Sequence, residues 1–248
     1  MSPRVELLPV EGLPEIGEGD GLGDLIADLI VLEQGDVVVI AQKVVSKAEG
    51  RTAVLRDVQP GERALELAAQ LDKDPALVEL ILRESRRIVR SERVLIVETH
   101  HGLICANAGI DSSNAGPGGD VVLLPVDPDA SARLIRAELA TVSGARVAVV
   151  ISDSFGRPWR VGQTEVAIGC AGLAPLDDWR GRDDRDDREL VATEIALVDQ
   201  IAAAADLVRD KASGTPVVIA RGLGERVTGE DGPGAGALLR DAAEDLFR

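Results

Sequence analysis

The composition of the 248-residue chain excludes several classes of protein before any motif is considered. A hydrophobic content of 45% suffices for a large buried core, whereas a formal net charge of −16 repels a nucleic-acid backbone. No apolar run approaches the roughly 18 residues of a membrane helix, and Arg4, Glu6 and Glu11 interrupt the stretch where a secretory signal has its apolar core. We expect a cytoplasmic, globular protein that binds neither nucleic acid nor membrane.

The apolar patterns along the chain predict a mixed α/β (α+β) fold. Short β-branched runs indicate strands at residues 37–45, 93–98, 102–106, 121–126, 147–152, 166–172 and 217–220. Apolar residues at three- and four-residue spacing predict helices at residues 22–32, 62–71, 75–89, 131–141, 189–208 and 235–247. No repeat or Ser/Gly linker is visible before about Gly222, so we expect one unit over residues 1–248, built from two intimately joined subdomains.

Two segments follow neither period. Residues 180–188 alternate Arg and Asp, which is typical of a solvated loop. Residues 228–237 are rich in Gly and contain Pro233, so they are either a connector to the last helix or a mobile loop over a site. The connector is slightly favoured.

Cysteine and histidine are rare in this chain. Cys105 and Cys170 lie in apolar runs without metal-ligand spacing, which indicates buried packing thiols. His100 and His101 are neighbours, and neighbours in a strand point to opposite faces, so they cannot chelate one ion together. We expect both histidines to be turn residues.

Common phosphate and hydrolase motifs are absent from the sequence: there is no GxxxxGK[ST], GxGxxG, HExxH or GxSxG pattern. Phosphate chemistry would therefore need another scaffold. Lys43 and Lys47 follow an apolar run that predicts a strand, and buried lysines require solvent or an anion. Lys47 lies beside Ser46 and before a turn at Gly50. Its ammonium could bind a phosphate or only reach solvent, and this segment leaves both alternatives open.

A second polar segment follows the strand expected at residues 102–106. Asp111 precedes Ser112, Ser113 and Asn114, and these side chains supply the oxygen ligands that Mg²⁺ or Mn²⁺ prefers. Clusters of Asx and Ser residues also form turns and helix caps. Taken alone, the segment favours a turn or cap over a metal site.

A third polar segment follows the apolar run at residues 147–152. Asp153 lies where that strand is expected to end, and ligand sites in open α/β sheets lie beyond the carboxyl ends of strands. Arg157 and Arg160 could clamp an anion or pair with surface acids. Two carboxylates at strand ends, with a lysine at a third, provide the groups for metal-assisted phosphoryl transfer.

Five motifs together resemble the coenzyme F420-0:L-glutamate ligase family, especially the ligase half of its two-domain actinobacterial members. They are LPVEGLP at 8–14, VSKAEGR at 45–51, ANAGIDSSN at 106–114, LPVDPD at 124–129 and ISDSFGRPWR at 151–160. The similarity spans residues 5–223 and is weaker over residues 224–248.

The resemblance implies a GTP-dependent ligase that adds L-glutamate to coenzyme F420-0 through an acyl phosphate, and then adds further residues by γ-linkage. It implies Mg²⁺ or Mn²⁺, two ions per site, with K⁺ as a helper. Family members form an intertwined homodimer, and a flavin reductase-like module is fused to the ligase or separate from it.

The resemblance also assigns residues. Asp111, Asp153 and Ser154 match divalent-metal ligands, and Asp111, Asp153 and Lys47 are the residues expected to carry catalysis. The positions expected to contact GTP are Leu13, Pro14, Glu15, Ile16, Gln42, Lys43, Lys47 and Asn114. Further contacts are expected after Leu223, where the candidates are Glu225, Glu230 and Asp231.

Two other functions are compatible with the sequence. An enzyme of the same scaffold could act on another acid acceptor, because the shared motifs serve nucleotide and metal. The chain could also be a nucleotide- and metal-binding module without turnover. The joint presence of Lys47, Asp111, Asn114 and Asp153 argues against the second alternative.

Overall fold

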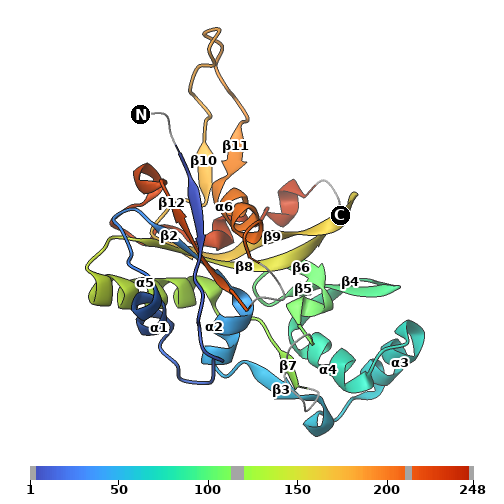
Figure 1. Cartoon of the computed structure of the whole chain (residues 1–248). Helices are drawn as coiled ribbons and strands as arrows, with labels where there is room; N and C mark the ends of the chain where they lie inside the picture. Colours follow the sequence, from blue (N-terminus) through green and yellow to red (C-terminus); the bar gives the residue numbers. More distant parts are fainter. Residues whose placement is uncertain (1–3, 113–119, 210–213, 246–248) are drawn as a thin grey trace.

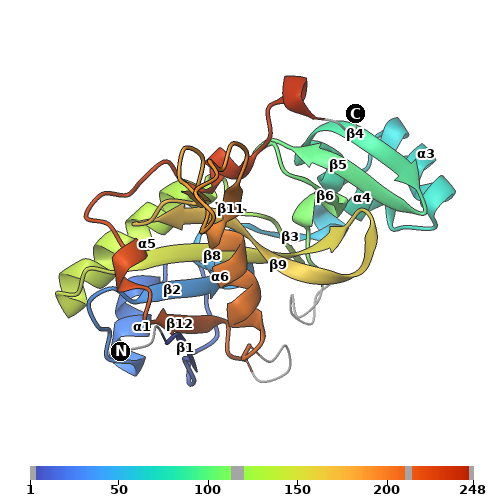
Figure 2. The same ribbon diagram turned by 90° about the horizontal axis from the view of Figure 1, so that it is seen from above.

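A mixed sheet forms the centre of the molecule (Figures 1 and 2). The computed structural model describes residues 4–112, 120–209 and 214–245. The sheet order is β1-β12-β2-β8-β9, with β2 (Val37–Ala41) and β8 (Ala148–Arg157) parallel in the middle. The other neighbours, β1 (Glu6–Pro9), β12 (Val217–Arg221) and β9 (Arg160–Ala171), pair antiparallel. The mixed α/β class predicted from the sequence is confirmed.

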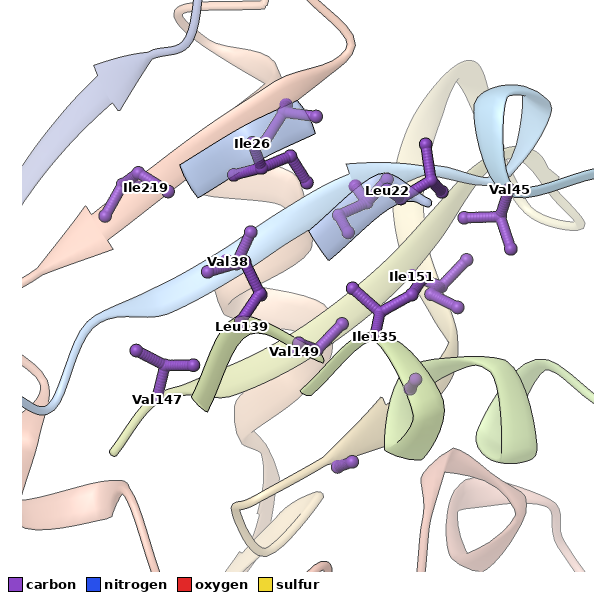
Figure 3. Packing of buried hydrophobic residues seen from close by; sticks show 14 of the residues in the cluster. Leu22, Ile26, Val38, Val45, Ile135, Leu139, Val147, Val149, Ile151 and Ile219 are labelled. Carbon is purple, nitrogen blue, oxygen red and sulfur yellow. The ribbon is translucent and has the colours of Figure 1, made fainter. Parts of the chain in front are cut away.

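Helices cover both faces of this sheet. α1 (Leu22–Leu29) and α5 (Pro128–Ser143) pack on one face, and α6 (Leu197–Asp206) packs on the other. Central strands covered on both sides need continuous apolar runs, which β2 and β8 provide. The hydrophobic core between the sheet and helices α1 and α5 is shown in Figure 3. Its labelled side chains include Leu22, Ile26, Val38, Ile135, Leu139, Val149, Ile151 and Ile219.

Local signals define the ends of α5. The Asp127 side chain accepts the N–H of Ala130, and Pro128 occupies the first turn, where a missing N–H costs nothing. Gly144 ends the helix in the left-handed conformation, with φ of 68°.

A smaller body lies beside the main sheet (Figure 2). It contains α3 (Glu62–Leu71), α4 (Pro75–Arg83) and an antiparallel sheet of β4 (Ser85–Glu92), β5 (Val94–Thr99) and β6 (Ile104–Ala106). It has its own hydrophobic cluster, which includes Leu67, Val78, Ile81, Leu95 and Val97.

The remaining elements are short. α2 (Gln42–Ala48) follows β2, and β3 (Thr52–Val54) pairs with β7 (Asp120–Val122). β10 (Leu176–Asp178) and β11 (Glu194–Ala196) form the base of an arm that projects from the main body (Figure 1). The 3₁₀ turns are η1 (Leu55–Asp57), η2 (Asn107–Gly109), η3 (Gly224–Arg226), η4 (Ala235–Leu238) and η5 (Ala242–Glu244).

Two expected elements change type along their length. The strand expected at 37–45 ends at Ala41, because the polar Gln42 and Lys43 do not suit a strand covered on both faces, and α2 begins there. The helix expected at 75–89 ends at Arg83, and the β-branched residues 88–89 lie in β4 instead. In contrast, the helix expected at 62–71 is confirmed as α3.

Other boundaries also differ from expectation. The helix expected at 189–208 is shorter and corresponds to α6 alone, because residues 194–196 form β11 and pair with β10. The strands expected at 147–152 and 166–172 extend to a shared hairpin, and the one expected at 121–126 ends at Val122. The helix expected at 235–247 is wrong for the described part, which forms only η4 and η5. There the Asp129 carboxylate accepts the N–H groups of Ala235 (2.7 Å) and Gly236 (3.1 Å).

The thiols and imidazoles have structural roles. Cys105 and Cys170 are free and buried, and burial raises the pKa of each thiol to about 12. His100 Nε2 lies 2.8 Å from the Arg83 carbonyl oxygen, and His101 Nε2 lies 2.8 Å from that of Pro125. Both histidines occupy the turn after β5, as expected. None of the described helices is long and apolar enough to cross a bilayer.

Candidate active site

Four chain segments meet at one edge of the main sheet. Ala41 at the end of β2 pairs with Ser152 of β8, so the parallel pairing ends here, while β8 itself continues to Arg157. The N–H of Ala41 donates to the Pro216 carbonyl (2.9 Å), which brings the start of β12 to the same edge. The N–H of Val10 donates to Val217 (2.9 Å), so the segment after β1 also arrives there. This edge is where an open α/β sheet forms ligand sites.

A cavity of about 350 Å³ opens at this edge. Its lining contains every described residue before Leu223 that the resemblance assigned to metal or GTP: Leu13, Pro14, Glu15, Ile16, Gln42, Lys43, Lys47, Asp111, Asp153 and Ser154. Asn114, the remaining assignment, lies outside the described residues. The structure therefore brings together groups that are up to about 140 positions apart in the sequence.

Several carboxylates line the cavity, among them Asp111 and Asp153. Lys43 Nζ lies 2.8 Å from Asp111 Oδ2. Burial raises the pKa of Asp153 to about 7, and the nearby Glu165 and Asp111 carboxylates act in the same direction. The Ser154 N–H and the Lys43 ammonium oppose this shift. A cation placed beside Asp153 would relieve the cost of holding its negative charge.

The oxygen donors suit a hard divalent cation. Asp111 and Asp153 offer carboxylates and Ser154 offers a hydroxyl, although residues 4–112, 120–209 and 214–245 contain no group of three or more His, Cys, Asp or Glu side chains arranged around one point. Mg²⁺ usually binds one or two protein carboxylates and completes its shell with water and phosphate oxygens. Asp153 and Ser154 are neighbours in β8 and point to opposite faces, so the donor set fits two cations, each shared with a phosphorylated ligand, rather than one.

Helix α2 connects the cavity to the segment after β1. Lys47 forms an ion pair with Glu15, which is itself exposed. Gln42 is buried, and its Oε1 accepts the Ser46 hydroxyl (2.9 Å). Lys43 and Lys47 are four residues apart and therefore lie on one face of the helix.

The sequence analysis missed a second polar group in the cavity. The lining also includes Ser152, Glu165, Asp206, Arg209, Gly214, Thr215 and Pro216. Glu165 comes from β9 and Arg209 from the segment after α6. The only local signal for Glu165 is an acid directly before the apolar run expected as a strand at 166–172, and an arginine after an Ala-rich helix gives none.

Several candidates lie elsewhere. Arg157 donates to the Val161 carbonyl (2.6 Å) within the β8–β9 hairpin tip, where Arg160 is also exposed. Asp231 pairs with Arg136 (2.6 Å), and its carbonyl accepts the Gly172 N–H (2.8 Å). Gly172 follows the end of β9, and because β9 runs antiparallel to β8, that end lies at the opposite edge of the sheet from the cavity. Since Asp231 bonds to Gly172, residues 224–231 reach that opposite edge. The cavity lining includes none of Glu225, Glu230 and Asp231.

Comparison with known proteins identifies the kind of enzyme. The sequence model of the F420-0:Gamma-glutamyl ligase family matches residues 12–222. The coenzyme F420:L-glutamate ligase of Methanopyrus kandleri is 46% identical over 248 residues, covering 99% of this chain and 97% of that protein. The protein of the same name from Methanothermobacter thermautotrophicus is 45% identical, covering 98% and 99%. That from Halobacterium salinarum is 48% identical, covering 86% and 85%.

The chain has a mixed α/β scaffold with an acidic cavity where the parallel pairing of β2 and β8 ends. The relatives from Methanopyrus kandleri and Methanothermobacter thermautotrophicus match it almost end to end, and they define it as an enzyme of the ligase class. The chain belongs to the F420-0:gamma-glutamyl ligase family.

Proposed function

We propose that the chain uses GTP to join L-glutamate to coenzyme F420-0 by an amide bond, and extends the product through γ-linkages. The observation that carries the proposal is the near end-to-end match to relatives named coenzyme F420:L-glutamate ligase. The convergence of the assigned residues in one cavity also supports it, because that cavity has carboxylates and lysines that could serve phosphoryl transfer.

The proposed reaction has two transfers. A carboxylate oxygen of F420-0 attacks the γ-phosphorus of GTP, a new P–O bond forms, and GDP leaves. The amine of L-glutamate then attacks the acyl carbon, loses a proton, and expels phosphate. Activation is needed because a free carboxylate is a poor electrophile with a poor leaving group.

The chain's residues divide into two sets in this scheme. Asp111, Asp153 and Ser154 would hold Mg²⁺ or Mn²⁺, which supplies positive charge against the phosphate oxygens. Lys47 would bind a phosphate oxygen after exchanging its exposed partner Glu15. We assign the nucleotide to the rest of the lining formed by residues 13–16 and by α2. K⁺ would assist in neutralising phosphate charge.

Isotope transfer tests the acyl phosphate. With F420-0 labelled by ¹⁸O in the acceptor carboxylate, the released phosphate should contain one ¹⁸O per amide formed, because the attacking oxygen leaves with phosphorus. Without F420-0 no GDP should form, and without glutamate GDP formation should stop at no more than about one equivalent per site, because the acyl phosphate is then not consumed. Unlabelled phosphate accompanying a labelled amide product would contradict the scheme.

Nucleotide competition tests the choice of GTP. Under matched conditions, kcat/KM for GTP should exceed that for ATP. An equal value or a preference for ATP would contradict the nucleotide assignment. Turnover with another acid, and none with F420-0, would instead indicate the same scaffold acting on a different acceptor.

A further inference from the structure

A buried carboxylate lies behind the proposed metal ligands. Glu165 is directly opposite Ser154 in the β8–β9 pairing. Glu165 Oε2 accepts the Ser152 hydroxyl (2.6 Å), and Oε1 accepts the Ser154 hydroxyl. Only 5% of the Glu165 side chain is exposed. The carboxylate therefore contacts two hydroxyls on the strand that also bears Asp153.

Arg209 holds this carboxylate from the other side. Its Nη1 lies 3.0 Å from Glu165 Oε2 and 3.0 Å from Ser152 Oγ, and its side chain is 7% exposed. The ion pair and the two serines form one network, which we call the Glu165 network. Its members are Ser152, Ser154, Glu165 and Arg209.

The burial of this pair has a cost that stability alone does not explain. Removing two charges from water costs several kcal/mol, and well-packed apolar residues often stabilise a fold as well or better. Arg209 Nε and Nη2 also lack hydrogen-bond partners among the residues that the structure describes. A pair with this cost, at the edge of the cavity, indicates a role in orienting the groups it contacts.

The direction of the hydrogen bonds suggests that role. The Ser154 hydroxyl has one proton, which it donates to Glu165, and its oxygen retains lone pairs suited to a cation. Carboxylates behind metal ligands commonly fix ligand orientation and raise ligand basicity in this way. Without Glu165, the Ser154 hydroxyl would lose the acceptor that fixes the direction of its proton.

We propose that Glu165, held in place by Arg209, is a positioning residue that fixes the Ser154 hydroxyl as an oxygen ligand for a divalent cation at this site. The inference rests on the proposed function, which assigns divalent metal to Asp111, Asp153 and Ser154. It adds to that function a carboxylate that need not touch metal or substrate. Glu165 acts through Ser154.

Mn²⁺ affinity provides a readout that does not depend on turnover. Glu165→Gln combined with Arg209→Gln removes both charges, keeps the net charge of the chain, and leaves no unpaired buried ion. Free Mn²⁺ is measured by electron paramagnetic resonance during titration, with thermal melting as the check of folding. The double variant should bind Mn²⁺ roughly 10- to 100-fold more weakly than the wild type.

A cycle with Ser154 distinguishes positioning from a general structural effect. Ser154→Ala alone should weaken Mn²⁺ binding, and Ser154→Thr, which keeps a hydroxyl, should restore most of it. In the Ser154→Ala background, the Glu165→Gln/Arg209→Gln change should weaken binding little further. Additive losses would overturn the proposal, as would unchanged affinity in a folded double variant.

Two further measurements keep the outcomes separate. If the double variant does not fold, Glu165→Asp replaces it in the same cycle, because this change keeps the charge but shortens the side chain. Losses of Mn²⁺ affinity that add to those of Ser154→Ala would again overturn the proposal. Wild-type protein that binds no Mn²⁺ would overturn this inference together with the metal assignment. Wild-type ligation is assayed in parallel, so failure of the proposed reaction is recorded independently of the affinity cycle.

Discussion

Asp153 shows, at the scale of one residue, a conflict between function and stability. Burial raises its pKa to about 7 from an ordinary value of 3.8. Protonated Asp153 favours the folded state at low pH, and this contribution is lost as the pH rises through the folded-state pKa. Above pH 7 the metal-free protein therefore holds an unfavourable charge.

The first prediction is that Asp153→Asn removes ligation while stabilising the metal-free protein. Ligation should fall by roughly 100-fold or more, because a ligand charge for the cation is lost. In the presence of a chelator, the melting temperature at pH 8 should rise by at least about 2–4 °C, with a smaller rise at pH 5. Near-normal ligation, or a lower melting temperature at pH 8, would contradict the account.

The second prediction concerns Lys47. If its ammonium binds a nucleotide phosphate, Lys47→Met should lower kcat/KM for GTP by roughly 10- to 100-fold, the usual effect of a charge-assisted hydrogen bond. Thermal stability should change little, since the partner Glu15 is exposed. Lys73→Met, at the end of α3, is the matched control. Equal GTP kinetics in the two variants would remove Lys47 from the active site.

Sequence reasoning found some site residues and missed others for a physical reason. Asp111, Asp153 and Lys47 follow apolar runs, and this pattern marked them as candidates, although Asp153 lies inside β8 and Lys47 inside α2 rather than at a strand end. Glu165 and Arg209 reach the cavity only because β9 folds back on β8 and α6 ends beside it. Such long-range pairing leaves no periodic signal in the local sequence.

Among the elements, α2 shows how predicted site residues can share one cavity although their secondary structure was predicted incorrectly. Val44 and Val45 extend the β-branched run of β2, so the pattern resembles one long strand. In the structure the chain turns into a helix at Gln42, and Lys43 and Lys47 become neighbours one turn apart. A strand would hold them much farther apart, at about 3.3 Å per residue.

The third prediction concerns the tip of the β8–β9 hairpin. Trp159 is 77% exposed and Val161 is 96% exposed, and exposed apolar side chains at one tip are typical of an interaction surface. We expect the wild type to be a homodimer and Trp159→Ser/Val161→Ser to shift it towards monomer in sedimentation velocity. Val191→Ser, which changes a valine of similar exposure in the β10–β11 arm, should leave the mass unchanged. A monomeric wild type, or a dimer unaffected at the tip, would contradict this contact.

For the whole molecule, class and family were readable from the sequence, whereas the arrangement was not. The apolar runs predicted most strands, and the five motifs pointed to the family that residues 12–222 match. The order β1-β12-β2-β8-β9 depends on contacts between distant segments, such as β1 with β12. That order determines which loops reach the cavity, and it places residues 224–231 at the opposite edge.

Ligation of L-glutamate to F420-0 in this cavity can be measured with the purified protein. The direct test incubates purified protein with F420-0, L-glutamate, GTP and Mn²⁺, and follows the acceptor by mass spectrometry. Asp153→Asn and a reaction without glutamate are the matched controls. The account predicts a product heavier by one glutamyl unit, formed by the wild type and neither control. An unchanged acceptor mass with folded wild-type protein, or an equal product from Asp153→Asn, would contradict it.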